Sequence, residues 1–246
     1  MSATYPIKLI LAMKSGNRCA IKDCRKILTS DGIESDPAVI GEAAHIYGEN
    51  KTAARYKENM TDAERNSYEN LIYLCPTCHT KIDKQEEDFP AELLFKIKND
   101  HENWVFDELD NGMSVMSFAE LEIASKAIAK GIHYEKPDFT VVPPEEKNKK
   151  NGLSSEIQVL IVAGLSRSAE VQNFLSKQSH LDYEFTDRLK NGFIIKYQEL
   201  KTTLKSDDLF VALYEFARNG ETDFKLQAAS LAILVHLFHL CEIFEK

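Results

Sequence analysis

The chain has 246 residues, a formal net charge of −9 and a hydrophobic fraction of 43%. This is the composition of an ordinary globular protein, and the length allows one large domain or two smaller ones. The acidic balance argues against a protein that coats DNA through its overall charge, although a local basic patch could still contact nucleic acid. The apolar runs are shorter than a membrane span and the N-terminus has no signal-peptide pattern, so we expect a cytoplasmic protein.

The first elements expected along the chain are short. Residues 5–17 form an amphipathic lead-in that ends at a Ser-Gly-Asn turn, and residues 18–28 carry two cysteines on a tight turn with a basic insert. Residues 38–48 have strand-like content and stop at a glycine, and residues 49–67 read as a polar loop that includes a helical turn. A short strand then leads into a second cysteine turn, where a helix opens near Pro76.

Helical periodicity dominates the rest of the chain. We expect a helix over residues 89–109, with Leu93 and Leu94 on its buried face, and another helix behind a Ser117 cap. Residues 136–152 contain three prolines and a run of charges, which predicts a linker. Amphipathic helical segments follow at 154–177, 183–204, 206–219 and 224–246.

Four of the five cysteines form two close pairs, Cys19 with Cys24 and Cys75 with Cys78. A disulfide framework is not expected in a chain of this kind. Paired thiols at short spacing indicate tetrahedral zinc instead, because each short loop presents two thiolates at once. We therefore predict a structural Zn²⁺ on these cysteines. Cys241 stands alone in an apolar stretch and reads as a small core residue.

Basic residues gather beside the first cysteine pair and again after His45. Their pattern fits contacts to DNA phosphates and equally fits ordinary solvated surface, so charge alone does not decide between the two. The candidate DNA-binding residues are Arg18, Lys22, Arg25, Lys26, Lys51 and Arg55.

The reactive residues follow one another in a particular order. They run Cys19, Cys24, His45, Asn70, Cys75, Cys78, His79 and Asp83. A strand that delivers a histidine, an asparagine in the return and a helix that delivers a second histidine resembles the HNH endonucleases and their ββα-metal fold. The stretches "EAAHIYGE" and "NLIYLCPTCHTKID" resemble the form of this family in which four cysteines hold the two turns together. The resemblance covers about residues 15–105.

The resemblance implies metal-dependent hydrolysis of DNA phosphodiester bonds. His45 is the candidate general base, since histidine titrates near neutrality and a strand end holds it rigidly. Asn70 would either orient that histidine or bind the metal, and a plain turn asparagine is the alternative. His79 and Asp83 lie one helical turn apart, so both can face one divalent ion. Mg²⁺ or Mn²⁺ is expected there, with Zn²⁺ or Ni²⁺ as alternatives.

The sequence departs from the family at the position before the candidate base. Many members carry a metal-binding aspartate or histidine there, and this chain has Ala44. The ion would then be held by more water, or another carboxylate would reach in. Glu42 lies three residues before His45, on the opposite face of a flat strand, so we expect it behind the ligands rather than among them.

The second half of the chain carries a weaker resemblance, based on the stretch "FAELEIASKAIA" and on the helical region that ends in "HLFHLCEIFEK". It is similar to HNH proteins of bacterial anti-phage loci and, more narrowly, to the C-terminal domains of ABC-three-component systems, in which a small effector is paired with an ABC-type ATPase. This resemblance implies that residues 153–246 bind a protein partner or a second copy of the chain. His236 and His239 lie one turn apart and read as a packed histidine pair rather than a metal site.

These observations predict an α+β protein. A small ββα-metal nuclease domain with its zinc site would occupy residues 1–110, a helix and linker 111–152, and an all-α domain 153–246. Two other functions stay open. One is a stand-alone restriction-type endonuclease whose helical half reads DNA, and the other is a zinc-stapled DNA- or protein-binding module whose nuclease site has decayed, which Ala44 would favour.

Overall fold

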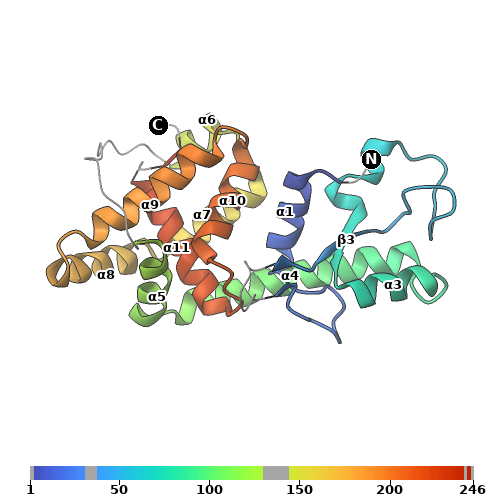
Figure 1. The fold of residues 1–246 in the computed structure, drawn as a ribbon, viewed down its shortest axis with the longest axis horizontal. Helices are drawn as coiled ribbons and strands as arrows, with labels where there is room; N and C mark the ends of the chain where they lie inside the picture. Colours follow the sequence, from blue (N-terminus) through green and yellow to red (C-terminus); the bar gives the residue numbers. More distant parts are fainter. Residues whose placement is uncertain (1–2, 31–37, 130–143, 241–242, 245–246) are drawn as a thin grey trace. The chain divides into compact units, whose positions relative to one another are not determined.

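The computed structural model describes residues 3–30, 38–129, 144–240 and 243–244. The fold is α+β, as the sequence predicts. The chain divides into two compact units, Met1–Asp107 and Glu108–Lys246 (Figure 1), and each is described by itself below. Cys241 and the first part of the expected linker, residues 136–143, lie outside the described residues. Within the described part of the chain, no helix is long and apolar enough to cross a membrane.

Short strands and helices make up the first unit. Strand β1 pairs with β2, and β3 pairs antiparallel with β4 so that His45 lies opposite Leu71. Helix α4 begins in this unit and runs past its boundary. In chain order the elements are α1 (Tyr5–Lys14), β1 (Thr29–Ser30), β2 (Ala38–Val39), β3 (Glu42–His45), α2 (Asp62–Arg65), the 3-10 helix η1 (Tyr68–Asn70), β4 (Leu71–Leu74), α3 (Pro76–Lys84) and α4 (Ala91–Val115).

The strand expected over residues 38–48 is two strands with a break at Gly41. A Cβ atom at Gly41 would lie 2.2 Å from the ring of Tyr73, so a larger residue here would require the Tyr73 side chain to move. The break separates the β1–β2 hairpin from the β3–β4 pair. Strand β3 is therefore a short segment that delivers Glu42 and His45 close to β4.

The core of the first unit is formed around β4, whose four residues are all buried. Leu94 of α4 is buried as expected, but Leu93 is 38% exposed, so the buried face of α4 is narrower than predicted. Lys98 is buried instead, and its Nζ donates to the carbonyls of Tyr68 and Leu71, each at 2.7 Å. Burial lowers the pKa of Lys98 to about 8. Lys98 therefore ties α4 to the segment that carries Asn70.

The second unit is helical. Helix α5 starts at the predicted Ser117 cap, which forms a capping box with Glu120. Residues 227–238 of the last helix, α11, are all buried, and this helix packs against α5, α7, α8 and α10 (Figure 1). The last segment is thus the central helix of this unit. The helices are α5 (Phe118–Ile128), α6 (Pro144–Lys150), α7 (Ser155–Leu165), α8 (Ser168–Leu181), α9 (Phe185–Leu200), α10 (Ser206–Arg218) and α11 (Phe224–His239).

The expected linker needs a correction where it is described. Residues 144–150 form α6, and the side chain of Lys147 is fully buried against the end of α11. Its Nζ donates to the carbonyl of Phe238 at 2.7 Å. A cation that binds the last carbonyls of a helix satisfies orphan acceptors and interacts well with the helix dipole. Residues 144–150 therefore form a packed helix, although their proline and charge content predicted a linker.

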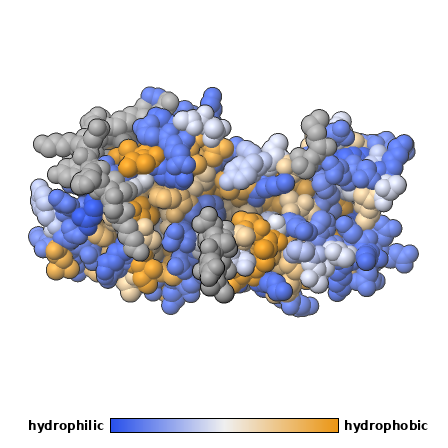
Figure 2. Space-filling view, in the orientation of Figure 1, coloured by the Kyte–Doolittle hydropathy of each residue, from blue (hydrophilic) through white to orange (hydrophobic). Residues whose placement is uncertain are grey.

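The visible surface is mostly hydrophilic with several hydrophobic areas (Figure 2). In the second unit the exposed apolar side chains include Val159 and Val162 of α7, which are 49% and 67% exposed, and Ile195 of α9 at 54%. Scattered exposed apolar side chains are normal on a globular protein. The predicted docking role of residues 153–246 therefore stays a prediction.

Candidate active site and metal centre

Two chain segments bring the four paired cysteines together. Cys19 sits on the turn after α1, where its N–H donates to the carbonyl of Lys26 at 2.9 Å. Cys75 caps the N-terminus of α3, and Cys78 lies in the first turn of that helix. The four sulfur atoms, those of Cys19, Cys24, Cys75 and Cys78, all lie within 4.8 Å of one another. The sulfurs of Cys24 and Cys75 are 3.9 Å apart, and tetrahedral zinc at about 2.3 Å from each sulfur requires about 3.8 Å.

Burial opposes ionisation of the thiols, and the neighbouring thiols change the balance from one cysteine to the next. Burial raises the pKa of Cys19 to about 11, and burial together with Cys75 raises the pKa of Cys78. Burial also acts on Cys75, but hydrogen bonds from Cys78 outweigh it and lower the pKa of Cys75. Zinc deprotonates the thiols that bind it, so it would overcome this opposition. The donor set and its spacing fit a structural Zn²⁺.

His45 lies at the end of β3 and is half-buried. Its Nε2 is 3.2 Å from Oδ1 of Asn66, which follows α2. The Asn66 Nδ2 donates to the carbonyl of Asp62 at 2.9 Å, which fixes the orientation of the amide. Asn66 was not among the residues predicted from the sequence, and its place after the Thr61–Glu64 capping box was the signal near it.

Asn70 is buried, with 2% of its surface exposed. Its Oδ1 accepts from the N–H of Tyr47, and its Nδ2 donates to the carbonyls of Tyr47 and Arg65, each at 2.9 Å. The N–H of Ile46 also donates to the Asn70 carbonyl at 2.8 Å. Asn70 thus holds the backbone that follows His45 against the start of β4.

On α3, His79 lies between two carboxylates. Its Nδ1 is 2.7 Å from Oε2 of Glu42, and its Nε2 is 3.3 Å from Oδ2 of Asp83. The hydrogen bond to Asp83 raises the pKa of His79, and Glu42 adds to this, against the opposing effect of burial. Burial would raise the pKa of Asp83, but His79 and Arg55 outweigh it and lower that pKa. Glu42 of β3 therefore touches His79 directly, and strand β3 and helix α3 are in contact.

Residues 19–86 match the HNH endonuclease family. This HNH segment begins at Cys19 and contains all four paired cysteines, both candidate histidines and Asp83. It covers less than half of the 246-residue chain. No curated protein matches the chain.

The six candidate DNA-binding residues fall into two groups, three lysines and three arginines. Lys22, Lys26 and Lys51 are exposed. The arginines contact other parts of the protein: the Arg18 Nη1 lies 3.5 Å from the Arg25 carbonyl, and the Arg25 guanidinium lies over the ring of Trp104, 4.0 Å from its centroid. The Arg55 side chain is also enclosed, with 6% of it exposed.

Proposed function

We propose that this protein is a metal-dependent endonuclease that hydrolyses phosphodiester bonds of DNA. The observation that carries the proposal is the 3.3 Å separation of His79 Nε2 and Asp83 Oδ2 in a segment that matches the HNH endonucleases. Two ligands at right angles around an octahedral ion, each at about 2.1 Å, lie about 3.0 Å apart, so this pair fits one divalent ion. His79 and Asp83 would hold Mg²⁺ or Mn²⁺, with Zn²⁺ or Ni²⁺ as alternatives. The ion would stabilise the charge that develops on the phosphate and the leaving oxygen.

His45 is the proposed general base, and its hydrogen bond sets which nitrogen acts. Because the Asn66 amide donates through Nδ2 to Asp62, its Oδ1 accepts from His45. His45 Nε2 then carries the hydrogen, and the lone pair on Nδ1 is left to take a proton from water. Asn66 holds this tautomer and the orientation of the ring.

Asn70 and Glu42 support the two histidines in different ways. Asn70 uses its amide on backbone groups of Tyr47 and Arg65, which supports the role of orienting the His45 segment over that of binding metal. Glu42 accepts from Nδ1–H of His79, so Nε2 is the nitrogen that would bind a metal once it has lost its proton. This is the supporting role expected for Glu42 from the sequence.

The four cysteines serve the fold in this proposal. A zinc closed by four thiolates has no open position for substrate, so it would hold the Cys19 turn to the start of α3. The exposed Lys22, Lys26 and Lys51 are the proposed contacts to DNA phosphates, with Arg18 and Arg25 behind them.

The proposal also includes a cellular role. We assign the chain to a cytoplasmic anti-phage defence system, in which an ABC-type ATPase binds residues 153–246 and restrains or triggers the nuclease. An unrestrained nuclease would damage its host, which makes a control domain physically reasonable. Co-purification of the full-length protein with its neighbouring gene products tests this part. Recovery of the chain alone, as a monomer, would contradict it.

A catalytically decayed binding module is the second candidate, because Ala44 replaces a common metal ligand. Ala44 is fully buried, so its position faces the core and offers no ligand. The deciding experiment incubates purified protein with supercoiled plasmid and Mg²⁺ or Mn²⁺, beside His45→Ala as the matched variant. Cleavage that needs the metal and His45 supports the nuclease. Metal-dependent cleavage at the wild-type rate by His45→Ala would move the base elsewhere, and absence of cleavage by the wild type would favour the decayed module.

A further inference from the structure

Arg55 lies in the loop between β3 and α2, and its guanidinium joins the two elements of the proposed catalytic site. Nε donates to the carbonyl of Ile46 at 2.9 Å, next to His45 on the β3 side. Nη1 donates to the carbonyl of Ile82 at 2.6 Å, and Nη2 donates to Oδ1 of Asp83 at 2.7 Å, both on α3. One planar side chain therefore fixes the distance between the strand and the helix.

The contact with Asp83 completes a chain of charged groups. Glu42 holds Nδ1 of His79, Nε2 of His79 faces Oδ2 of Asp83, and Arg55 holds the other carboxylate oxygen, Oδ1. The two proposed metal ligands are thus each held by a charged neighbour: the Glu42 carboxylate holds His79, and the Arg55 guanidinium holds Asp83. With Oδ1 engaged by Arg55, Oδ2 is the oxygen left beside His79. A lysine could not copy this arrangement, because its single ammonium cannot reach three acceptors in a fixed plane.

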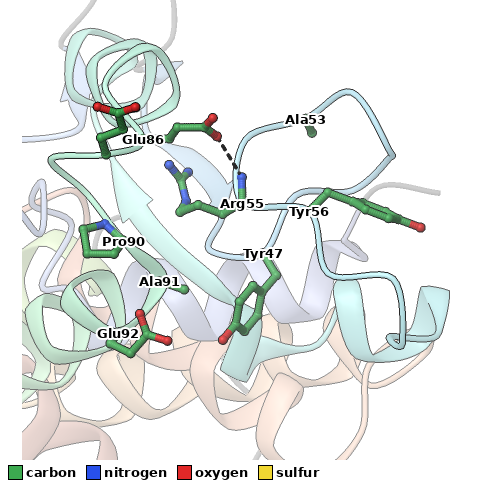
Figure 3. A pocket seen from close by; sticks show the side chains of 9 residues that line it. Tyr47, Ala53, Arg55, Tyr56, Glu86, Pro90, Ala91 and Glu92 are labelled. Atoms are coloured by element: carbon green, nitrogen blue, oxygen red, sulfur yellow. Dashed lines mark hydrogen bonds between the residues drawn. The ribbon is translucent and has the colours of Figure 1, made fainter.

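The backbone at Arg55 adopts a conformation that disfavours a side chain. Its φ is 55°, in the left-handed region, which is unfavourable for a residue other than glycine. The N–H of Arg55 donates to Oε2 of Glu86 at 3.1 Å, in the wall of a shallow pocket that Tyr47 and Tyr56 also line (Figure 3). A strained conformation that persists in a site motivates a search for its function. Here it places the guanidinium between β3 and α3.

We propose that Arg55 is a positioning residue for the catalytic metal site, which it holds ready by fixing Asp83 and the spacing of β3 and α3. This role rests on the proposed nuclease function. It differs from the contact to DNA phosphates that the charge pattern suggested for Arg55, because the side chain is 6% exposed and its guanidinium is hydrogen-bonded to the protein's own carbonyls and carboxylate.

The first test measures Mn²⁺ binding to the zinc-loaded full-length protein by titration calorimetry. Arg55→Gly and Arg55→Ala both remove the guanidinium, but glycine also removes the left-handed backbone cost. We expect both variants to bind Mn²⁺ about 10–100-fold more weakly, as is typical when a group behind a metal ligand is lost. Arg55→Gly should be the more stable of the two, so equal losses of affinity cannot be due to unfolding. Arg55→Lys should recover little of the affinity.

Arg65→Ala is the matched control. Arg65 is a buried arginine that anchors the same loop through hydrogen bonds to the carbonyls of Gly48, at 2.8 Å, and of Lys57, and neither of these bonds involves Asp83. It should lower the melting temperature and leave Mn²⁺ affinity within a few-fold of wild type. A loss as large as that of Arg55→Gly would mean that any loosening of the loop suffices and would overturn the specific role.

The second test asks whether Arg55 acts through Asp83. In an Asp83→Ala background, Arg55→Gly should lower Mn²⁺ affinity by a smaller factor than it does in the wild-type background, because the effects of coupled residues are not additive. DNA binding with Mn²⁺ omitted should be unchanged by Arg55→Gly, including its salt dependence. If the variant instead keeps Mn²⁺ affinity and loses DNA affinity, with a salt slope smaller by about one, Arg55 is a phosphate contact and the proposal fails. If the zinc-loaded wild-type protein binds no Mn²⁺, the nuclease proposal is overturned as well.

Discussion

Replacing Asn70 by aspartate separates the two roles that the family resemblance leaves for this residue. A metal ligand would tolerate the change, since a carboxylate binds Mg²⁺ or Mn²⁺ better than an amide does. A residue that staples the backbone would not tolerate it. The Nδ2 donors face the carbonyls of Tyr47 and Arg65, and aspartate would place an oxygen against each of them.

The magnitude follows from the bonds that Asn70 makes. Its side chain forms three hydrogen bonds at 2.9 Å, and each contributes about 0.5–1.5 kcal/mol net, so Asn70→Ala should cost about 2–4 kcal/mol. Asn70→Asp should cost as much or more, about 3–5 kcal/mol, because it buries an unpaired charge. Either loss is a large part of the stability of an ordinary domain.

The single tryptophan gives a probe for this measurement. Trp104 belongs to the first unit and stacks on His101, with ring centroids 5.7 Å apart, so its fluorescence reports unfolding of the first unit. In urea titrations the unfolding midpoint should be highest for the wild type, lower for Asn70→Ala and lowest for Asn70→Asp. If Asn70→Asp unfolds at the same urea concentration as the wild type and binds Mn²⁺ more tightly, Asn70 is a metal ligand and its structural role is refuted.

Further predictions concern the metals and the helical unit. The purified protein should carry about one tightly held zinc, and Cys75→Ser should lose it and lower the Trp104 midpoint; an unchanged zinc content would contradict the four-thiol site. His79→Ala should keep that zinc but lose most Mn²⁺ affinity in a calorimetric titration. Burial, with smaller effects of His239 and Lys190, lowers the pKa of His236 to about 4. The unfolded chain takes up this proton near pH 6.5 and the folded chain does not, so stability should be lost as pH falls from about 6.5 toward 4. The shift corresponds to at most about 3 kcal/mol, and melting curves of His236→Asn should lack that part of the pH dependence.

The sequence by itself determined the local features of this protein. The closeness of the four cysteines could be predicted, because each of two short turns carries two cysteines. A zinc site then requires only that these two turns meet. The Pro76 start of α3 and the Ser117 cap of α5 were equally clear, since capping depends on residues within one helical turn. The order of histidine, asparagine and histidine indicated the HNH match for the same reason, because motif order is written along the chain.

The tertiary structure decided what happens between distant segments. Arg55 and Asp83 are 28 positions apart, and Lys98 and Tyr68 are 30 apart, and no local pattern marks either pair. Charged residues usually remain in water, so burial of Lys98 or Arg55 is visible only once the fold supplies carbonyls and a carboxylate to compensate the lost solvation. In the same way, an apolar α11 could have been a core helix or half of an interface. The packing of α5, α7, α8 and α10 around it made it a core helix.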